Sequence, residues 1–329
     1  MPQQKSLQAA RSDRRAKPNA FKAKQKTPVV RLLVWDGNWY IHRAHHAFGM
    51  RRLVSRSGED VSILYGFLQL VAADLRRFRP THALVVFDGQ NSAAYRCAIY
   101  PAYKANRRTE DASATLVDNQ SLVVLEQQAK IVHALSLLGI QSVAKREVEG
   151  DDLLAAVVHQ FGKSSKLIIC TGDKDMAVLV RPGVKLFNSM TRTMYDEDGI
   201  REHYGVRPHQ MTDYLCMLGD STDNVPGCPQ VGKVNAIRIL HTYGSVDLAV
   251  KSGKEPRIAT WVKNGGYELA KSLISLRSDL VLPFGLDEMH IRSAVDGARQ
   301  QLADSGLKHH HPWVEEHLSG KQTSTLFRV

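Results

Sequence analysis

Short apolar runs alternate with longer segments of helical periodicity, and this alternation most constrains the fold. Strand-like runs rich in Val, Leu and Ile occur at 29–35, 82–87, 141–143, 167–170 and 184–187. Helical spacing occurs at 39–48, 61–78, 122–138 and 151–161. Strands that alternate with helices predict an α/β fold with a mainly parallel central sheet flanked by helices. No run approaches the ~20 apolar residues of a membrane span.

Carboxylates follow the predicted strands or open the helices beside them. Because the carboxyl ends of parallel strands meet at one edge of a sheet, we expect these acids to converge in space. Helix capping explains each group alone, but independent caps do not require a shared edge. The acids are Asp36, Asp88, Glu149, Asp151, Asp152, Asp173, Asp175, Asp220 and Asp223.

Divalent metal ions are the simplest way to hold so many carboxylates together, because their mutual repulsion is severe in a dry interior. Oxygen ligands with no interleaved His or Cys favour Mg²⁺ or Mn²⁺ over zinc. The sequence therefore predicts a metal site at the carboxyl edge of the sheet.

The charge of the chain indicates an anionic partner. The formal net charge is +11, and the segment 1–28 carries much of it, with almost nothing apolar to bury. We expect this segment to be a disordered basic tail that holds phosphates; a leader without such a role and a transit peptide are the alternatives. The four cysteines form no C-x-x-C pair, which favours reduced thiols in a cytoplasmic protein.

A segment of different character follows Asp88. Between Tyr95 and Arg108 it interleaves three tyrosines with four cations. This pattern suits a single nucleic-acid strand, whose phosphates meet Lys and Arg while its bases stack on aromatic rings. A solvated basic loop with the tyrosines packed inward is the alternative.

Several motifs together resemble the 5′ nuclease family, which includes flap endonucleases and the 5′-to-3′ exonuclease domain of bacterial DNA polymerase I. The resemblance covers about residues 29–245, continues weakly to about 290, and points to the free-standing phage and bacterial members. The matching stretches are Val34-Trp35-Asp36-Gly37-Asn38, Val86-Phe87-Asp88-Gly89, Tyr103-Lys104-Ala105-Asn106-Arg107, Glu149-Gly150-Asp151-Asp152, Thr171-Gly172-Asp173-Lys174-Asp175 and Gly219-Asp220-Ser221-Thr222-Asp223-Asn224-Val225-Pro226-Gly227.

The resemblance implies a PIN-like fold with four parts: a basic tail at 1–28, a catalytic domain at 29–205, a helical domain at 206–300 and a C-terminal tail at 301–329. It implies two Mg²⁺ ions, with Mn²⁺ able to substitute. Asp88, Glu149 and Asp151 would hold one ion, with Asp152 between the two sites and Asp36 nearby. The second ion would be held by Asp173, Asp175, Asp220 and Asp223.

Two DNA-binding features are also implied by the resemblance. An arch at about 89–121 would pass a 5′ single strand, with Arg96, Tyr103 and Lys104 at the catalytic site and Arg107 and Arg108 on the DNA. A helix-three-turn-helix would grip the duplex, with a bound K⁺ ion. Its residues are Gly227, Val231, Gly232, Lys233 and Arg238. Gln230 stands where the family usually has glycine, and Gln resists a positive φ.

The final residues resemble a peptide that docks on the replication sliding clamp, with Gln322, Leu326 and Phe327 as its anchors. The expected function is a monomeric, structure-specific DNA 5′ nuclease of the cytoplasm of a bacterial or phage-infected cell. It would act on 5′ flaps, nicks and free 5′ ends in replication and repair. A PIN-type ribonuclease and a non-catalytic DNA-binding replication protein are the alternatives.

Overall fold

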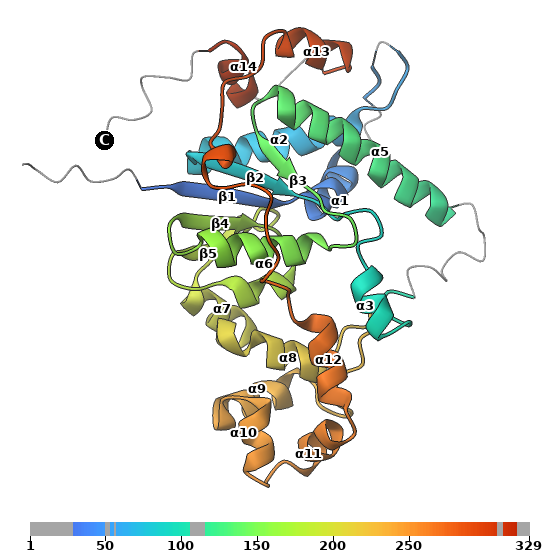
Figure 1. The fold of residues 1–329 in the computed structure, drawn as a ribbon, viewed down its shortest axis with the longest axis vertical. Coiled ribbons are helices and arrows are strands. Elements are labelled where there is room, and N and C mark those ends of the chain that lie inside the picture. Colours follow the sequence, from blue (N-terminus) through green and yellow to red (C-terminus); the bar gives the residue numbers. More distant parts are fainter. Residues whose placement is uncertain (1–28, 50–52, 56, 106–115, 308–311, 321–329) are drawn as a thin grey trace, which may run out of the picture.

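The computed structural model describes residues 29–49, 53–55, 57–105, 116–307 and 312–320. These residues form an α/β domain with a smaller helical domain beside it (Figure 1). The basic segment 1–28, residues 106–115 of the expected arch and the segment 321–329 lie outside the described residues. Within the described ranges, no helix is both long and apolar enough to cross a membrane.

A six-stranded sheet forms the centre of the α/β domain, in the order β3-β2-β1-β4-β5-β6. Every described pair is parallel except β5 with β6. The prediction of a mainly parallel sheet is confirmed; β6 was not predicted, because three partly polar residues show no clear alternation. The strands are β1 Arg31–Asp36, β2 His82–Val86, β3 Gln141–Val143, β4 Lys166–Cys170, β5 Val184–Asn188 and β6 Thr193–Tyr195.

The two faces of the sheet supply two separate cores, because successive strand residues point to opposite faces. In β1, Leu32 and Val34 belong to one core, and Leu33 and Trp35 belong to the other. The first core lies under α6 (Gly150–Phe161), and the second lies under α1 (Gly37–Phe48), α2 (Ser62–Phe78) and α5 (Leu116–Leu137).

The helical domain shares the core on the α6 face. Met211 and Leu215 of α8 and Leu273 of α12 are buried in the same apolar cluster as Leu153 of α6. The two domains are therefore packed together through one continuous core. The helices that follow the sheet along the chain are α7 Glu197–Tyr204, α8 Met211–Leu218, α9 Lys233–Tyr243, α10 Val246–Lys251, α11 Pro256–Lys263 and α12 Gly266–Ile274. Short 3₁₀ helices lie at Lys174–Leu179 and Pro208–Gln210.

The stretch after α12 returns to the sheet and corrects the expected C-terminal tail. Beyond a 3₁₀ turn at Asp287–Met289, Ile291 N donates to the carbonyl of Thr81 at 3.1 Å. The chain then forms α13 (Ala298–Asp304) and α14 (Pro312–Leu318), which pack over α2. Trp313 and Val314 are 7% and 2% exposed, so this part of 301–329 belongs to the core of the α/β domain. Helices of seven residues are too short to give a clear periodic signal.

The strand order reverses at β1, so the carboxyl end of β1 is the expected ligand-binding edge of the sheet. From β1 the chain proceeds to β2 on one side and later to β4 on the other, and ligands of open α/β sheets bind where the strand order reverses. Asp36 is the last residue of β1 and is in register with Val86, while Trp35 is in register with Cys170. The segments after β1, β2 and β4 therefore begin at the same edge.

Candidate metal-dependent active site

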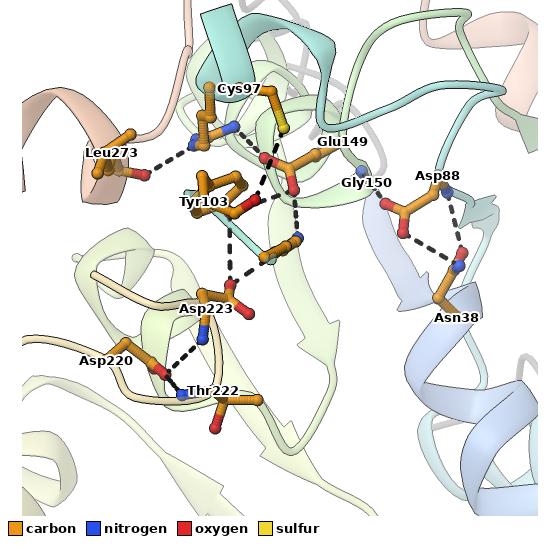
Figure 2. A network of polar contacts seen from close by, with 12 residues as sticks. Asn38, Asp88, Cys97, Tyr103, Glu149, Gly150, Asp220, Thr222, Asp223 and Leu273 are labelled. Carbon is orange, nitrogen blue, oxygen red and sulfur yellow. Dashed lines mark hydrogen bonds and ion pairs between the residues drawn. The ribbon is translucent and has the colours of Figure 1, made fainter. Parts of the chain in front are cut away.

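Asp36 and Asp88 tie together the segments that leave this edge. Asp36 caps α1, because its Oδ1 accepts from Trp39 N at 3.0 Å, and its Oδ2 accepts from Thr171 Oγ1 at 2.8 Å. Asp88 accepts from Gly150 N at 2.6 Å and from Asn38 Nδ2 at 3.2 Å (Figure 2). Residues far apart in the sequence thus fix the two carboxylates at one place.

Burial and mutual repulsion make these acids reluctant to ionise. Burial is the main cause that raises the pKa of Asp36 to about 7, and the charges of Asp173 and Asp88 add to it. The pKa of Asp151 is raised well above its usual value by burial and by Asp173, Asp36, Asp88 and Glu149. Each acid therefore lies within the electrostatic reach of the others.

A second group of acids surrounds the segment after β4. Burial and then the charge of Asp173 raise the pKa of Asp175 to about 7. Asp220 differs, because the hydrogen bond and charge of Lys174, whose Nζ lies 2.8 Å from its Oδ2, lower its pKa despite partial burial. Asp223 contributes to the repulsion felt by Asp173 and Asp175. This group adjoins the first through Asp173.

Glu149, Lys104 and Tyr103 lie between the two groups. The Lys104 ammonium forms an ion pair with Glu149 and lies 3.8 Å from Asp223 Oδ2. The Tyr103 hydroxyl lies 3.3 Å from Glu149 Oε1 and 3.4 Å from Asp223 Oδ2 (Figure 2). Lys104 N also donates to the carbonyl of Asp223 at 2.9 Å. The base of the expected arch is thus bonded to the acids of both domains.

The donor set fits hard divalent ions. All the gathered ligands are carboxylates, and Asp175 Oδ1 is buried without a hydrogen-bond partner. In the described part of the chain, no three Asp, Glu, His or Cys side chains are grouped tightly enough to hold one ion as they stand. Lys104, Lys174, Asn38 and Thr171 instead supply the donors to these carboxylates. A divalent cation that entered the site would replace these donors as the partner of the carboxylates.

Arg96 and Asp152 are placed differently from the expectation. Arg96 is 3% exposed, and its guanidinium contacts both oxygens of Asp152 at 2.9 Å, Glu149 and the carbonyl of Leu273. Asp152 is 1% exposed and also accepts from Arg277 N at 3.0 Å. Both side chains therefore have their hydrogen-bonding groups engaged by other parts of the protein. Arg96 does not face a passing strand, and the oxygens of Asp152 are bonded to Arg96 and Arg277 N rather than open to two ions.

The loop between α8 and α9 has a backbone that only particular residues allow. Gly219 has φ +69°, and a Cβ there would lie 2.5 Å from Gly227 N. Asn224 also has a positive φ, and its side chain donates to Ala102 O at 2.8 Å. Gln230 does adopt the positive φ, +61°, that its residue type resists.

The expected duplex contacts are placed unequally. Val231 is 9% exposed, so its side chain belongs to the core. Lys233 is exposed in the first turn of α9, after Gly232, which has open space around it. Arg238 is engaged by Glu255 through contacts of 2.7 and 3.0 Å. Of the expected contacts, Arg107, Arg108, Gln322, Leu326 and Phe327 lie outside the described residues.

Asn38, Thr171 and Lys174 lie in the motifs that resemble the 5′ nuclease family, but the sequence analysis predicted no role for them. Each provides a donor to an acid, and Thr171 Oγ1 also accepts from Asp173 N at 3.0 Å. Their position next to the strand-end acids could have predicted this role, because a hydrogen-bond donor there stabilises a carboxylate that is repelled by its neighbours.

Comparison with known proteins identifies the family. The 5′-3′ exonuclease N-terminal resolvase-like domain matches residues 31–205, and the 5′-3′ exonuclease C-terminal SAM fold matches residues 206–296. The chain therefore belongs to the 5′-3′ exonuclease family.

Two curated relatives differ in how much of their length is shared. A 5′-3′ exonuclease of Aquifex aeolicus is 29% identical over 282 residues, which cover 84% of this chain and 92% of that protein. DNA polymerase I of Pseudomonas aeruginosa is 32% identical over 65% of this chain, but the match spans only 22% of the polymerase.

Solved structures share the fold. The T5 5′-exonuclease with bound divalent metal ions (zinc) has a TM-score of 0.62 and 21% identity, over 84% of this chain and 98% of that one. The catalytic core of Rad2 in complex with DNA substrate has a TM-score of 0.52 and 16% identity, over 89% and 93%.

Proposed function

We propose that the chain is a structure-specific DNA 5′ nuclease, acting as a 5′-to-3′ exonuclease and flap endonuclease in replication and repair. The observation that carries the proposal is the convergence of carboxylates from four segments at one sheet edge with Asp220 and Asp223 of the α8–α9 loop, beside the base of the expected arch. The family assignment and the DNA-bound structural relatives support the same substrate class.

Two divalent ions, Mg²⁺ by preference with Mn²⁺ able to substitute, fit this donor set. Asp88, Glu149 and Asp151 would hold one ion. The other would be held by Asp173, Asp175, Asp220 and Asp223, with Asp36 near both. When bound, such ions supply an activated water and stabilise charge on the leaving oxygen. We assign Asp152 a supporting role, because Arg96 and Arg277 N already satisfy its oxygens.

Lys104 is the side chain best placed to bind the scissile phosphate. Its ammonium lies between the two acid groups, and Glu149 raises its pKa despite burial, so it stays charged. A substrate phosphate can replace Glu149 as its partner and gain a charge-assisted hydrogen bond. Tyr103 is 4% exposed, and it orients Glu149 and Asp223 rather than stacking on a base.

The duplex would lie along the α8–α9 loop. Exposed Lys233 and the backbone around Gly232 and Gly227 can contact phosphates there. We propose that the α8–α9 loop also binds a K⁺ ion. The positive φ of Gln230 supports this, because the loop keeps the backbone conformation that a glycine at this position would give.

The last residues would dock on a sliding clamp through Gln322, Leu326 and Phe327, and the enzyme would act as a monomer in the bacterial or phage-infected cytoplasm. Truncation after Lys321 should abolish clamp binding in a pull-down and leave cleavage unchanged. Clamp binding by the truncated chain would refute the docking assignment.

Cleavage of a 5′-labelled flap duplex tests the proposed function, with nicked, blunt and RNA-flap duplexes beside it, in Mg²⁺ and in EDTA. We expect Mg²⁺-dependent cuts near the DNA flap junction and products with 5′ phosphates. Preferential cutting of the RNA flap would favour the PIN-type ribonuclease. Binding of the flap without cleavage would favour a non-catalytic DNA-binding protein.

A further inference from the structure

A pocket of about 500 Å³ lies at the opposite edge of the sheet from the acids. It adjoins Arg31, which begins β1, and Thr81, which precedes β2, so it opens at the amino ends of these strands. Figure 1 shows the start of β1 and helix α14 on this side of the fold, away from α3 (Ala94–Ile99).

The rim of this pocket is cationic. Arg31, Arg76, Arg79 and Arg292 line it, and Glu316 is the acid among its lining residues. Arg31 Nε donates to the carbonyl of Arg79 at 3.0 Å, which holds its guanidinium at the rim. Among the described residues, none of the four arginines has a carboxylate within ion-pair distance.

Helix dipoles do not explain this arrangement. Arg76 lies in the last turn of α2 and Arg79 follows as its C-cap, where cations complement the helix dipole. Arg31 begins a strand and Arg292 lies in the return segment, so neither has such a reason to be there. Four like charges around one hollow repel one another, and an anion inside it relieves that repulsion.

Another part of the pocket lining is apolar and partly aromatic. Leu75, Ile291 and Trp313 contribute to it. The Trp313 ring is fixed by stacking on His317, with ring centroids 4.6 Å apart and planes at 13°. A lining that combines apolar side chains with four guanidinium groups matches a planar base joined to a phosphate.

We propose that this pocket binds a nucleotide, with its base against Ile291 and Trp313 and its phosphate on the four arginines. The choice of a nucleotide among anions rests on the proposed function, because such an enzyme meets both free nucleotides and DNA strands. Strands of five or six residues at ~3.3 Å each separate the two edges by about 20 Å. The pocket is therefore a second site, distinct from the acidic edge.

Tryptophan fluorescence of the full-length protein in EDTA tests this proposal, because no cleavage is needed and the result is independent of the nuclease assay. One arm adds a nucleoside 5′-monophosphate, and the other adds a single-stranded trinucleotide. The double variant Arg79→Gln/Arg292→Gln is compared with Arg201→Gln/Arg257→Gln, which loses the same charge from exposed sites in α7 and α11, outside the pocket lining. Trp313→Phe identifies the reporting residue.

We expect the ligand to change the fluorescence of the wild-type protein and not that of Trp313→Phe. The dissociation constant should rise about tenfold or more in the pocket variant alone, because two charge-assisted contacts are lost. Tighter binding of the trinucleotide would identify a strand as the source, and equal affinities would identify the free nucleotide. Equal weakening in both double variants, no weakening, or a response kept in Trp313→Phe would overturn the proposal.

Discussion

Replacement of Arg96 by methionine removes a cation that joins three parts of the molecule. Its guanidinium holds Asp152 and Glu149 at the start of α6 and the carbonyls of Leu273 and Ser275 at the end of α12, while Arg96 itself belongs to α3. Methionine has a similar reach and no charge, so the substitution tests the ionic contacts more than the packing.

The magnitude follows from burial. Asp152 and Glu149 are 1% and 4% exposed, and removal of one partner from a buried ion pair costs about 3–5 kcal/mol. Two carbonyls that lose a donor add about 1 kcal/mol each. A total loss of about 5–7 kcal/mol lowers Tm by about 10–30 °C at about 2–4 °C per kcal/mol.

Thermal unfolding in EDTA, followed by circular dichroism, measures this loss. Arg299→Met is the matched control, because its partner Glu315 is 40% exposed and the pair is worth under about 1 kcal/mol. Arg96→Met/Asp152→Asn should regain part of the lost stability, since one stranded charge is removed. If Arg96→Met has the same Tm as Arg299→Met but has lost DNA binding, the structural role of Arg96 is refuted. That result would favour the original prediction that Arg96 contacts the DNA strand in the arch.

Further predictions concern the site and its neighbours. Lys104→Ala should lower turnover of a flap substrate about 10²-fold, with duplex binding nearly unchanged in an anisotropy assay; equal loss in both would refute its contact with the phosphate. Asp36 and Asp175 have folded pKa values of about 7 against 3.8. Their contribution to stability is therefore full below about pH 4 and is lost as pH rises through about 7, so calorimetry in EDTA should show Tm falling from about pH 5 to about pH 8. An Asp36→Asn/Asp175→Asn variant should flatten that profile, and an unchanged slope would contradict the assignment. Gly89→Ala should be strongly destabilised in the same calorimeter, because its Cβ would lie 1.7 Å from Lys145 O; wild-type stability would contradict the close packing there.

The sheet and the place of the acids could be predicted from sequence because both follow from local patterns. Apolar runs set the strands, and parallel strands share one carboxyl edge, so Asp36, Asp88 and Asp173 had to come near one another. The predicted strand at 141–143 and the helix at 151–161 agree with β3 and α6 to within a residue.

The partners of the charged side chains could not be predicted in the same way. Arg96 contacts Leu273, 177 residues away, and nothing local to either residue signals that contact. The basic pattern around Tyr103 predicted contact with a nucleic-acid strand, with inward-packed tyrosines as the alternative. Tyr103 is buried as that alternative has it, and Arg96 is buried as well. Desolvation and long-range ion pairs decide such cases, and both depend on the assembled fold.

Cleavage by Asp173→Ala tests the central assignment most directly. Asp173 repels acids of both groups, whereas Asp198 in α7 is exposed and lies 3.9 Å from Arg201, so Asp198→Ala is the control. On a 5′-labelled flap duplex in Mg²⁺, Asp173→Ala should lose about three orders of magnitude in rate while it still binds the flap. A rate equal to those of the wild type and Asp198→Ala would contradict an active site built on these carboxylates.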